Sequence, residues 1–368
     1  MKLSRLVKKC YSTLTSNRVV VAMSGGVDSS VSAALLKQQG YQVQGVYMRN
    51  WDTSDEKGVC TSREDWEDVQ RVCEVLKIEC RHVDFVKEYW NDVFEKTLED
   101  YAHGLTPNPD IACNSYIKFG ALLDQIPKDA MLATGHYCRS TPDGKLLRGR
   151  ERRKDQSYYL STVPQEALRR TLFPLGDIES KTDVKRMASS LGLDFIAKKK
   201  ESMGICFVGQ RKRFAQFLEQ YIDQPPGPVV DLEDKVIGEH QGLYAYTIGQ
   251  ASRICHGSHK WVVAKKIMSE NKLVVVPGTN HPALFHQGCS ARDWVWIHHQ
   301  PPAEFNGQMV IDAQIRYRQL PEKAVLSVKD GKYHVEFNEP IRAIAAGQQV
   351  VIWDNDWCLG GGVIDEVY

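Results

Sequence analysis

The sequence predicts an α/β protein with three parts: an N-terminal doubly wound parallel sheet, a small central module and a C-terminal β-barrel. In the first half of the chain, short β-branched runs alternate with longer segments of helical periodicity, which is typical of βαβ units around a parallel sheet. After about residue 213, short strand-like runs are separated by Gly, Pro, Asn and Asp, which is typical of all-β structure. A length of 368 residues is enough for two or three such domains.

The N-terminal elements follow one another in a regular order. The run RVVVAM at 18–23 leads into the glycines of SGGVDSS, and Val31, Ala34 and Leu35 follow at helical spacing as far as Gly40. A parallel sheet of this kind binds its ligands at the carboxyl ends of its strands. The remaining predicted strands cover 41–48, 81–85 and 130–134, and the remaining predicted helices cover 62–77, 87–102 and 115–126.

The second half begins with a helix at about 213–222 and the rigid breaker QPPGP at 224–228. Strands are then expected at 260–265, 273–276, 309–317, 324–328, 333–337 and 349–353. We therefore divide the chain into a leader at 1–17, an α/β domain at 18–212, a central linking module at 213–282 and a β-barrel at 283–368.

The leader is basic, rich in hydroxyl groups and free of acidic residues, since the first acidic side chain is Asp28. This composition resembles an organellar transit peptide, with a frayed tail as the alternative. No stretch approaches the roughly 20 apolar residues that a membrane-spanning helix needs, so no membrane partner is expected. Ten cysteines in this length are too few for a disulfide scaffold, and no paired CxxC motifs predict a structural zinc, so no metal site is expected.

Charge is unevenly distributed although Lys+Arg and Asp+Glu nearly balance at 47 and 46. Residues 148–213 carry 16 basic and 8 acidic side chains, whereas 19–147 carry 13 and 20, and 214–368 carry 13 and 18. A basic block within an acidic protein predicts a surface that contacts a phosphate backbone. An ordinary solvated face is the alternative.

The segment SGGVDSS between the first strand and helix predicts a phosphate-binding loop. Gly25 and Gly26 allow close backbone approach, and the helix amides from about Asp28 onward point at a bound anion. The segment lacks the Lys-Ser/Thr pair of a Walker loop, which argues against a kinase-like site. It resembles instead the pyrophosphatase loop of enzymes that cut ATP between its α and β phosphates, in the adenine nucleotide alpha hydrolase-like fold.

Two cysteines have surroundings that favour reactivity. Cys113 lies in NPDIACN, a turn-rich segment before a predicted helix, where a thiol has a lowered pKa. Asp110 is three residues upstream, close enough for proton transfer. Cys206 lies in MGICFVG between two clusters of basic residues that would stabilise a thiolate or persulfide. For either cysteine alone, a buried filler role is the alternative.

Ten segments in order resemble the signature segments of the tRNA-specific 2-thiouridylases, from about residue 18 to the C-terminus. They are SGGVDSSV, TPNPDIACNSYIKF, ATGHY, KDQSYYL, LFPLG, SMGICFVG, PGPVVD, YTIGQ, IRYRQ and CLGGG. The resemblance implies that ATP, carried with Mg²⁺, adenylates the 2-keto oxygen of the wobble uridine. A persulfide sulfur, supplied by a donor protein, then replaces that oxygen and leaves AMP.

Together with the basic leader, the resemblance implies a eukaryotic, mitochondrial form of the family. The resemblance also assigns roles to residues. Cys206 would hold the persulfide, Cys113 would attack it to free the sulfur, and Asp110 would be the acid/base. The ATP-binding residues would be Ala22, Met23, Ser24, Gly25, Gly26, Val27, Asp28, Ser29, Met48 and Gly135. The tRNA-binding residues would be Asn108, Pro109 and Asp110 at the target base, with His136, Lys154, Asp155, Gln156, Arg316, Tyr317 and Gln348 elsewhere.

Some features leave alternatives open. Tyr317 also fits a barrel-core aromatic, and His136 also fits a structural histidine at a strand end. The family usually has Arg-Lys-Gly after YTIGQ and Pro before Gly347, where this chain has Ala251-Ser252-Arg253 and Ala346.

An iron–sulfur cluster on Asp110, Cys113 and Cys206 is an alternative that we do not favour. Another adenylating tRNA-modifying enzyme and a catalytically silent RNA-binding relative are the competing functions.

Overall fold

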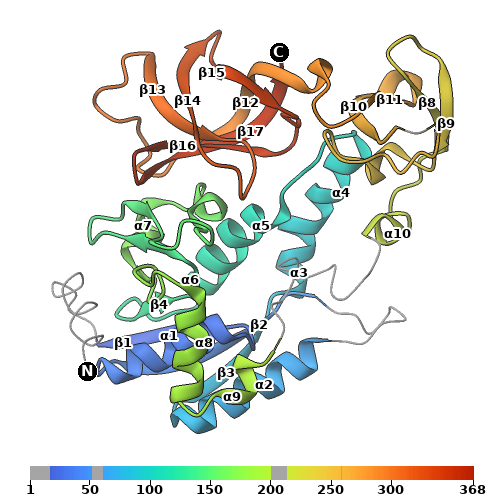
Figure 1. Cartoon of the computed structure of the whole chain (residues 1–368). Helices are drawn as coiled ribbons and strands as arrows, with labels where there is room; N and C mark the ends of the chain where they lie inside the picture. The colour runs from blue at the N-terminus through green and yellow to red at the C-terminus, as the bar shows by residue number, and fades with distance from the viewer. Residues whose placement is uncertain (1–16, 52–60, 200–213, 258) are drawn as a thin grey trace.

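The computed structural model describes residues 17–51, 61–199, 214–257 and 259–368 (Figure 1). Its N-terminal part is a five-stranded sheet in the order β3-β2-β1-β4-β7, and every pairing in it is parallel. The predicted doubly wound sheet is confirmed. Its strands are β1 (Arg18–Met23), β2 (Gln42–Arg49), β3 (Glu79–Asp84), β4 (Met131–Ala133) and β7 (Thr171–Leu172).

Helices cover both faces of this sheet because side chains alternate along each strand. On β1, Val19, Val21 and Met23 enter the core cluster beneath one face, and Val20 and Ala22 enter the cluster beneath the other. The first face is covered by α1 (Val27–Gln38), α2 (Thr61–Leu76), α8 (Lys181–Ser190) and α9 (Asp194–Ala197). The second face is covered by two long helical segments, one made of α3 (Val86–Tyr89), η3 (Trp90–Phe94) and α4 (Glu95–Ala102), the other of α5 (Pro109–Ala112), η4 (Cys113–Ala121) and α6 (Leu122–Asp124).

The helix that carries Cys113 begins earlier than the sequence pattern indicated. It was expected from about residue 115, with Cys113 in the preceding turn, but α5 starts at Pro109. Asn108 has extended backbone angles, and Pro109 occupies the first helical position, where its fixed φ suits a helix and its missing N–H costs nothing. Asp110 and Cys113 are therefore held on a helix rather than on a loop.

The central module begins with α10 (Phe214–Leu218), which is shorter than the predicted helix. Its four-stranded sheet has the order β10-β11-β8-β9 and buries a small core that includes Val263 and Val275. The strands are β8 (Gly227–Val230), β9 (Val236–His240), β10 (Trp261–Ile267) and β11 (Lys272–Pro277), with short helices η6 (Leu243–Ala245), η7 (Met268–Glu270) and η8 (Pro282–Leu284) between or after them.

The C-terminal part is a closed six-stranded barrel, as predicted, because the first and last of its strands pair with each other. The three glycines at 360–362 permit the closure: a Cβ on Gly360 would lie 2.0 Å from the Val295 carbonyl oxygen, and one on Gly361 would lie 2.2 Å from that of Val350. The strands are β12 (Phe285–Trp296), β13 (Gln308–Gln314), β14 (Glu322–Lys329), β15 (Lys332–Arg342), β16 (Gln349–Asp354) and β17 (Trp357–Val367).

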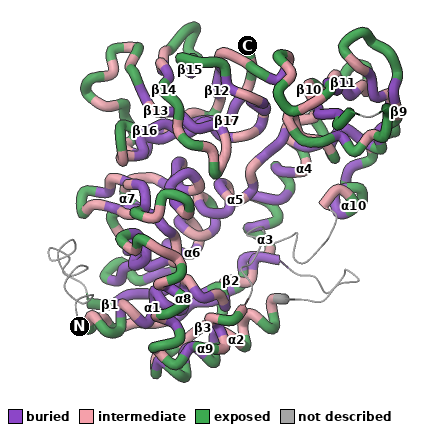
Figure 2. The backbone as a smooth tube through the Cα atoms, in the orientation of Figure 1, coloured by how far each residue is buried: buried purple, intermediate pink, exposed green. Residues whose placement is uncertain are grey.

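A hairpin of the α/β domain extends the barrel sheet, a feature that no sequence pattern indicated. It consists of β5 (Cys138–Ser140) and β6 (Leu146–Arg148), and β6 pairs with the start of β17. Cys138, Leu146 and Cys358 are fully buried at this joint, and Figure 2 shows buried residues both within the barrel and beneath it. The remaining short helices, η5 (Ser157–Leu160) and α7 (Gln165–Arg169), follow this hairpin in the chain.

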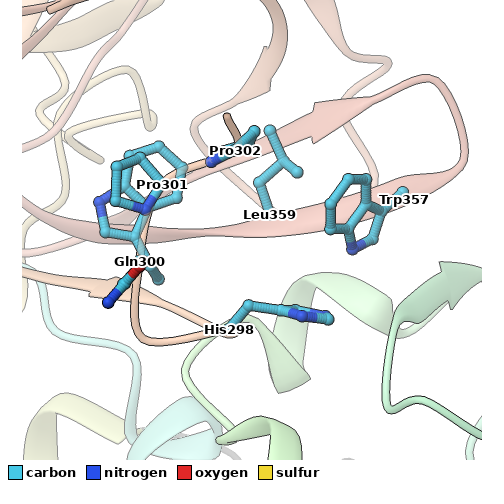
Figure 3. A pocket seen from close by; sticks show the side chains of 7 residues that line it. His298, Gln300, Pro301, Pro302, Trp357 and Leu359 are labelled. Atoms are coloured by element: carbon cyan, nitrogen blue, oxygen red, sulfur yellow. The ribbon is translucent and has the colours of Figure 1, made fainter. Parts of the chain in front are cut away.

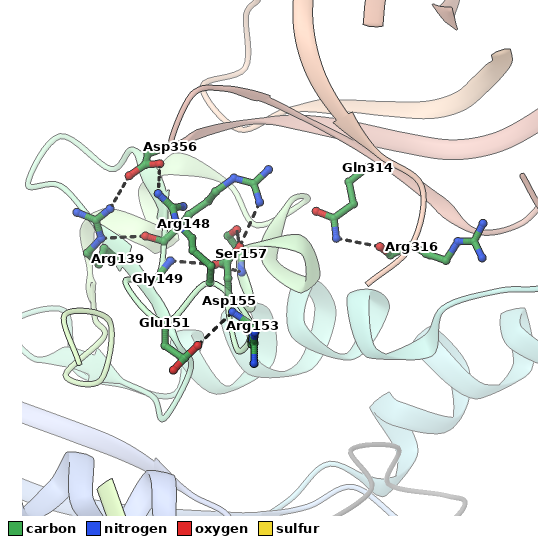
Figure 4. A network of polar contacts seen from close by, with 11 residues as sticks. Arg139, Arg148, Gly149, Glu151, Arg153, Asp155, Ser157, Gln314, Arg316 and Asp356 are labelled. Atoms are coloured by element: carbon green, nitrogen blue, oxygen red, sulfur yellow. Dashed lines mark hydrogen bonds and ion pairs between the residues drawn. The ribbon is translucent and has the colours of Figure 1, made fainter. Parts of the chain in front are cut away.

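Part of the basic block at 148–213 holds this joint together instead of facing outward (Figure 4). The Arg148 guanidinium lies 3.9 Å from the centre of the Trp353 ring and 3.5 Å from the Asp155 carboxylate. Both charged side chains are buried. Arg139 and Arg152 both bind Asp356, which lies just before β17.

Replacing Asp155 with alanine should destabilise the protein by about 3–5 kcal/mol, because it leaves the buried Arg148 charge without its partner. We expect the melting temperature to fall by roughly 5–15 °C in a calorimetric scan. Arg153 is exposed in the same segment, so the control Arg153→Ala should change stability by less than about 0.5 kcal/mol. Equal melting temperatures for Asp155→Ala and the control would show that the pair does not hold the joint.

Candidate functional site

The glycine-rich loop lies between the carboxyl end of β1 and the first turn of α1, where the sequence placed it. Gly25 has φ +69, a conformation that glycine adopts without strain. The Ser29 hydroxyl accepts a hydrogen bond from the Ser24 amide at 3.2 Å and donates to the Gly26 carbonyl at 3.2 Å. These bonds fix the conformation of the loop at the N-terminus of α1, a position that suits an anion.

Asp28 and Gly135 meet at the same edge of the sheet. The Tyr137 hydroxyl donates to Asp28 at 2.7 Å, and the Lys181 ammonium lies 3.2 Å from the other carboxylate oxygen. A Cβ on Gly135 would lie 2.9 Å from the Ser29 amide nitrogen, so only glycine fits against the first turn of α1. Met48 lies near the end of the neighbouring strand β2 and is partly buried. The predicted ATP-binding residues therefore gather around one edge of the sheet.

Asp110 and His136 lie near one lysine that the sequence reading did not single out, Lys118. Burial raises the pKa of the Asp110 carboxyl to about 6, although the charge of Lys118 lowers it. Burial, and then the same charge, hold the pKa of His136 well below its usual value. Asp110 can therefore exchange a proton near neutral pH, and His136 is a neutral hydrogen-bonding group there.

The segment that carries Cys113 is a π-helix, η4, of nine residues. Such segments are rare and occur often at functional sites. Lys118 donates to the Asn114 side chain at 2.9 Å, and the Asn114 amide donates to the Tyr159 carbonyl at 3.3 Å. Cys113 is 9% exposed. Cys113 is the first residue of this π-helix, and no sequence pattern predicts its wider turn.

Gly135 and His136 connect the nucleotide loop to the Cys113 helix. Gly135 contacts the first turn of α1, and the ring of His136 lies 6.1 Å from that of Phe119 on η4. The His136 Nδ1 atom is 2.8 Å from the Thr134 hydroxyl. The predicted nucleotide site and the predicted Asp110–Cys113 site are thus neighbours on the carboxyl edge of the sheet.

The barrel reaches this region through two of its turns. Tyr317 lies over Tyr159 with ring centres 4.4 Å apart, so it forms part of the domain joint. The Gln348 side chain donates to the Thr106 carbonyl at 2.7 Å, and the Thr106 amide donates to the Ala346 carbonyl at 2.9 Å. Through this hydrogen bond, Gln348 stabilises the segment that leads to Asn108, Pro109 and Asp110.

Several predicted tRNA contacts are engaged inside the protein. Arg316 donates to the backbone carbonyls of Arg342 and Ala343. Asp155 accepts from the Gly149 and Ser157 amides and from the Ser157 hydroxyl, so both of its oxygens are occupied. Gln156 accepts from the Tyr137 amide at 3.0 Å. Lys154 is partly buried. Direct contact of these residues with tRNA stays a prediction, whereas the present contacts of Asp155 and Gln156 order the loop beside Tyr137.

Cys206 and the basic residues at 200–213 lie outside the described residues, as does the leader at 1–16. Seven of the ten cysteines fall in the described part of the chain, and all seven are free thiols. No cluster of three or more His, Cys, Asp or Glu side chains able to hold a metal occurs among the described residues. Within the same ranges, no helix is both long enough and apolar enough to cross a membrane.

A separate cavity of about 200 Å³ lies at the barrel, lined by Trp296, His298, Gln300, Pro301, Pro302, Trp357 and Leu359 (Figure 3). None of these residues belongs to the predicted site. Lys145 covers the Trp357 ring at 4.2 Å from its centre, and the ring of His298 meets that of Trp357 edge-on at 5.4 Å. The candidate site is therefore defined by the contacts among its own residues and not by this cavity.

A parallel sheet with a lysine-free glycine loop at its carboxyl edge defines a nucleotide-binding α/β domain, and a family model described as "tRNA methyl transferase HUP domain" matches residues 17–210. Models described as "tRNA methyl transferase PRC-barrel domain" and "Aminomethyltransferase beta-barrel domain" match residues 215–277 and 286–364. The chain belongs to the tRNA-specific 2-thiouridylase family, MnmA.

The relatives cover almost the whole chain. The MnmA protein of Pseudomonas putida strain W619 is 45% identical over 360 residues, which cover 95% of this chain and 94% of its own. That of Shigella boydii serotype 18 is 45% identical over 365 residues, covering 96% and 98%. Among solved structures, the U34-tRNA thiolase NcsA of Methanococcus maripaludis, which has a 4Fe-4S cluster, matches with a TM-score of 0.35 and 17% identity over 59% of this chain and 69% of its own. That score is too low to carry a functional argument.

Proposed function

We propose that this protein is an ATP-dependent tRNA-uridine 2-sulfurtransferase that acts on the wobble uridine of mitochondrial tRNAs. The observation that carries the proposal is the meeting of the lysine-free glycine loop with the Asp110–Cys113 helix at one edge of the sheet, joined by Gly135 and His136. The family membership of the chain supports the same activity. The mitochondrial location rests on the composition of the leader.

The first chemical step is adenylation of the uridine. The 2-keto oxygen attacks the α phosphorus of ATP, a new P–O bond forms, and pyrophosphate leaves. Asp110, whose pKa is raised to about 6 by burial, would take the proton that the uridine loses as its oxygen becomes a nucleophile. The loop amides and Gly25 would hold the phosphates, and Mg²⁺ bound with ATP would neutralise part of their charge.

The second step replaces the adenylated oxygen by sulfur. A donor protein loads Cys206 as a persulfide, and the Cys113 thiolate attacks the Cys206 sulfur atom. A Cys113–Cys206 disulfide forms and hydrosulfide leaves with the electron pair of the broken S–S bond. Hydrosulfide then attacks C2 of the base and expels AMP. A dithiol reductant must return the disulfide to two thiols before the next turnover.

The direct test is to incubate the protein with ATP, a sulfide source and unmodified tRNA, and to measure 2-thiouridine by mass spectrometry of nucleosides. The expected result is ATP-dependent formation of 2-thiouridine together with AMP and pyrophosphate. ATP turnover without a thiolated nucleoside would contradict the proposal. Expression of a fluorescent fusion to the first residues of the chain tests the mitochondrial location separately.

Reversing the charges of Arg152 and Arg153 should weaken tRNA binding, because both side chains are exposed in the basic block, Arg152 while it is also paired with Asp356, and a phosphate backbone is bound largely through such charges. We expect a loss of about 10-fold at 0.1 M salt and a salt dependence of the binding constant that is less steep by about one or two in its logarithmic slope. Filter binding at several salt concentrations measures both. ATP affinity serves as the control and should not change, and a tRNA affinity that stays constant would show that this face does not bind tRNA.

A further inference from the structure

The glycine loop has no cation of its own to neutralise a polyphosphate. Residues 22–29 contain one charged side chain, Asp28, and it is negative. A Walker loop solves the same problem with a lysine inside its motif. Backbone amides and a helix dipole supply only partial charges, and Mg²⁺ bound with ATP would neutralise only part of the phosphate charge, so ammonium or guanidinium groups from elsewhere in the chain would complete the neutralisation.

The structure places a lysine on each side of the loop. On the Gly25 side, the Lys199 ammonium lies 3.3 Å from the Gly25 carbonyl oxygen. On the Asp28 side, the Lys181 ammonium lies 3.2 Å from the Asp28 carboxylate and 5.7 Å from the centre of the Tyr137 ring. Lys181 begins α8, and Lys199 follows α9, so both come from the chain segment that packs over α1.

Lys199 is held in position by two acidic side chains of α2. Its ammonium is 2.7 Å from Asp65 and 2.6 Å from Asp68, and all three side chains are about one-third exposed. A Cβ on Gly25 would lie 2.7 Å from the Asp65 carbonyl oxygen, so α2 packs directly against the loop. These contacts place a cation beside the loop before any nucleotide arrives.

Lys199 stays charged over the working range of pH. Although burial lowers its pKa, hydrogen bonds to Asp65 and Asp68 and their charges raise it above the usual value. Two carboxylates shared by one ammonium leave a local excess of negative charge. A triphosphate arriving at the loop would therefore meet a cation already oriented toward Gly25. A phosphate oxygen could replace one of the two carboxylates as a partner of that ammonium, at little cost in side-chain entropy.

We propose that Lys181 and Lys199 together take the place of the Walker lysine and bind the β and γ phosphates of ATP from opposite sides of the glycine loop. The inference rests on the proposed ATP-dependent function. Lys181 neutralises Asp28, which would otherwise repel the phosphates at the start of α1. Lys199 donates to the phosphate oxygens on the Gly25 side. Neither lysine is assigned to the α phosphate or to the adenosine.

The test compares ligands that differ only in their phosphates. Calorimetry gives the affinities of wild type, Lys199→Gln and Lys181→Gln for ATP with Mg²⁺, for inorganic pyrophosphate and for AMP. Loss of one charge-assisted hydrogen bond should weaken ATP and pyrophosphate binding about 10- to 100-fold, whereas AMP binding should stay within about twofold. Lys199→Arg should recover most of the ATP affinity, because it restores the charge.

Lys198 provides the matched control, since it is the exposed neighbour of Lys199 in the same short segment. Lys198→Gln should bind all three ligands like wild type. If Lys199→Gln and Lys198→Gln have the same ATP affinity, the proposal is overturned. It is also overturned if affinities for ATP, pyrophosphate and AMP fall together, because that pattern marks a structural role. If the wild-type protein itself binds no ATP, the proposed function is contradicted. That result differs from the two outcomes that overturn only the role of the lysines.

Discussion

Replacement of Asp110 by asparagine should lower the rate of thiolation by about 10²–10⁴-fold, the range expected for loss of a general base. The change keeps the size of the side chain and removes its ability to accept a proton. Single-turnover formation of 2-thiouridine measures the effect, and binding of tRNA and ATP should stay near that of wild type. A variant that thiolates at the wild-type rate would remove Asp110 from the chemistry.

The pH profile gives a second readout for the same residue. Because burial raises the pKa of Asp110 to about 6, the wild-type rate should rise with pH through that value as the carboxylate forms. This limb should be absent in Asp110→Asn. Lys118 lowers the same pKa, so Lys118→Met should move the limb to higher pH.

Stability distinguishes a catalytic from a structural Asp110. A carboxyl whose folded pKa is raised contributes stability that is fully present below its unfolded pKa of about 3.9 and is lost as pH rises through the folded value near 6. At pH 8 the wild type therefore carries the cost of a buried carboxylate. We expect Asp110→Asn to melt at the same temperature or higher at pH 8, and a clear fall in its melting temperature would indicate a structural role.

Replacement of Cys113 by serine should lower turnover by at least about 10³-fold, because an unactivated hydroxyl is a far weaker nucleophile than a thiolate toward a persulfide. ATP consumption in the adenylation step should persist, and persulfide should accumulate on Cys206. Nucleoside mass spectrometry measures product, and mass spectrometry of the intact protein measures the persulfide.

Cys255 supplies the control for this prediction. It is an exposed free thiol in the central module, so Cys255→Ser should leave turnover unchanged. Full turnover by Cys113→Ser would rule out the two-cysteine scheme. Loss of activity in both variants to the same degree would point to general damage rather than to a specific nucleophile.

The sequence indicated the sheet and its loop well because both are local patterns. Hydrophobic runs of β-branched residues mark buried parallel strands, and the predicted first strand at 18–23 coincides with β1. Glycines between a strand and a helix mark the loop. The start of the Cys113 helix was missed because a proline after an extended asparagine reads equally as a turn or as a helix start.

Contacts between distant segments could not be predicted in this way. The pairing of β6 with β17 joins residues more than two hundred positions apart. Neither strand has a sequence pattern from which its partner strand could be predicted. For the same reason the residues of the basic block differ in burial: Arg148 is buried against Trp353 and Asp155, whereas Arg153 is exposed. A charge count cannot separate them, since burial depends on the packing of the barrel.

The sequence by itself determined the α/β class, the barrel and the phosphate-binding loop, and it indicated Asp110 and Cys113 as a candidate site, because each depends on residues close together in the chain. Only the tertiary structure decided that Lys118 lies near Asp110 and His136, that Gln348 braces the segment before Asp110, and that Lys181 and Lys199 flank the loop. Apart from Asp110 and Lys118, which share one helical segment, these contacts join residues from separate elements, and the electrostatic effect of a charge depends on its distance in space and on burial, not on its position in the sequence.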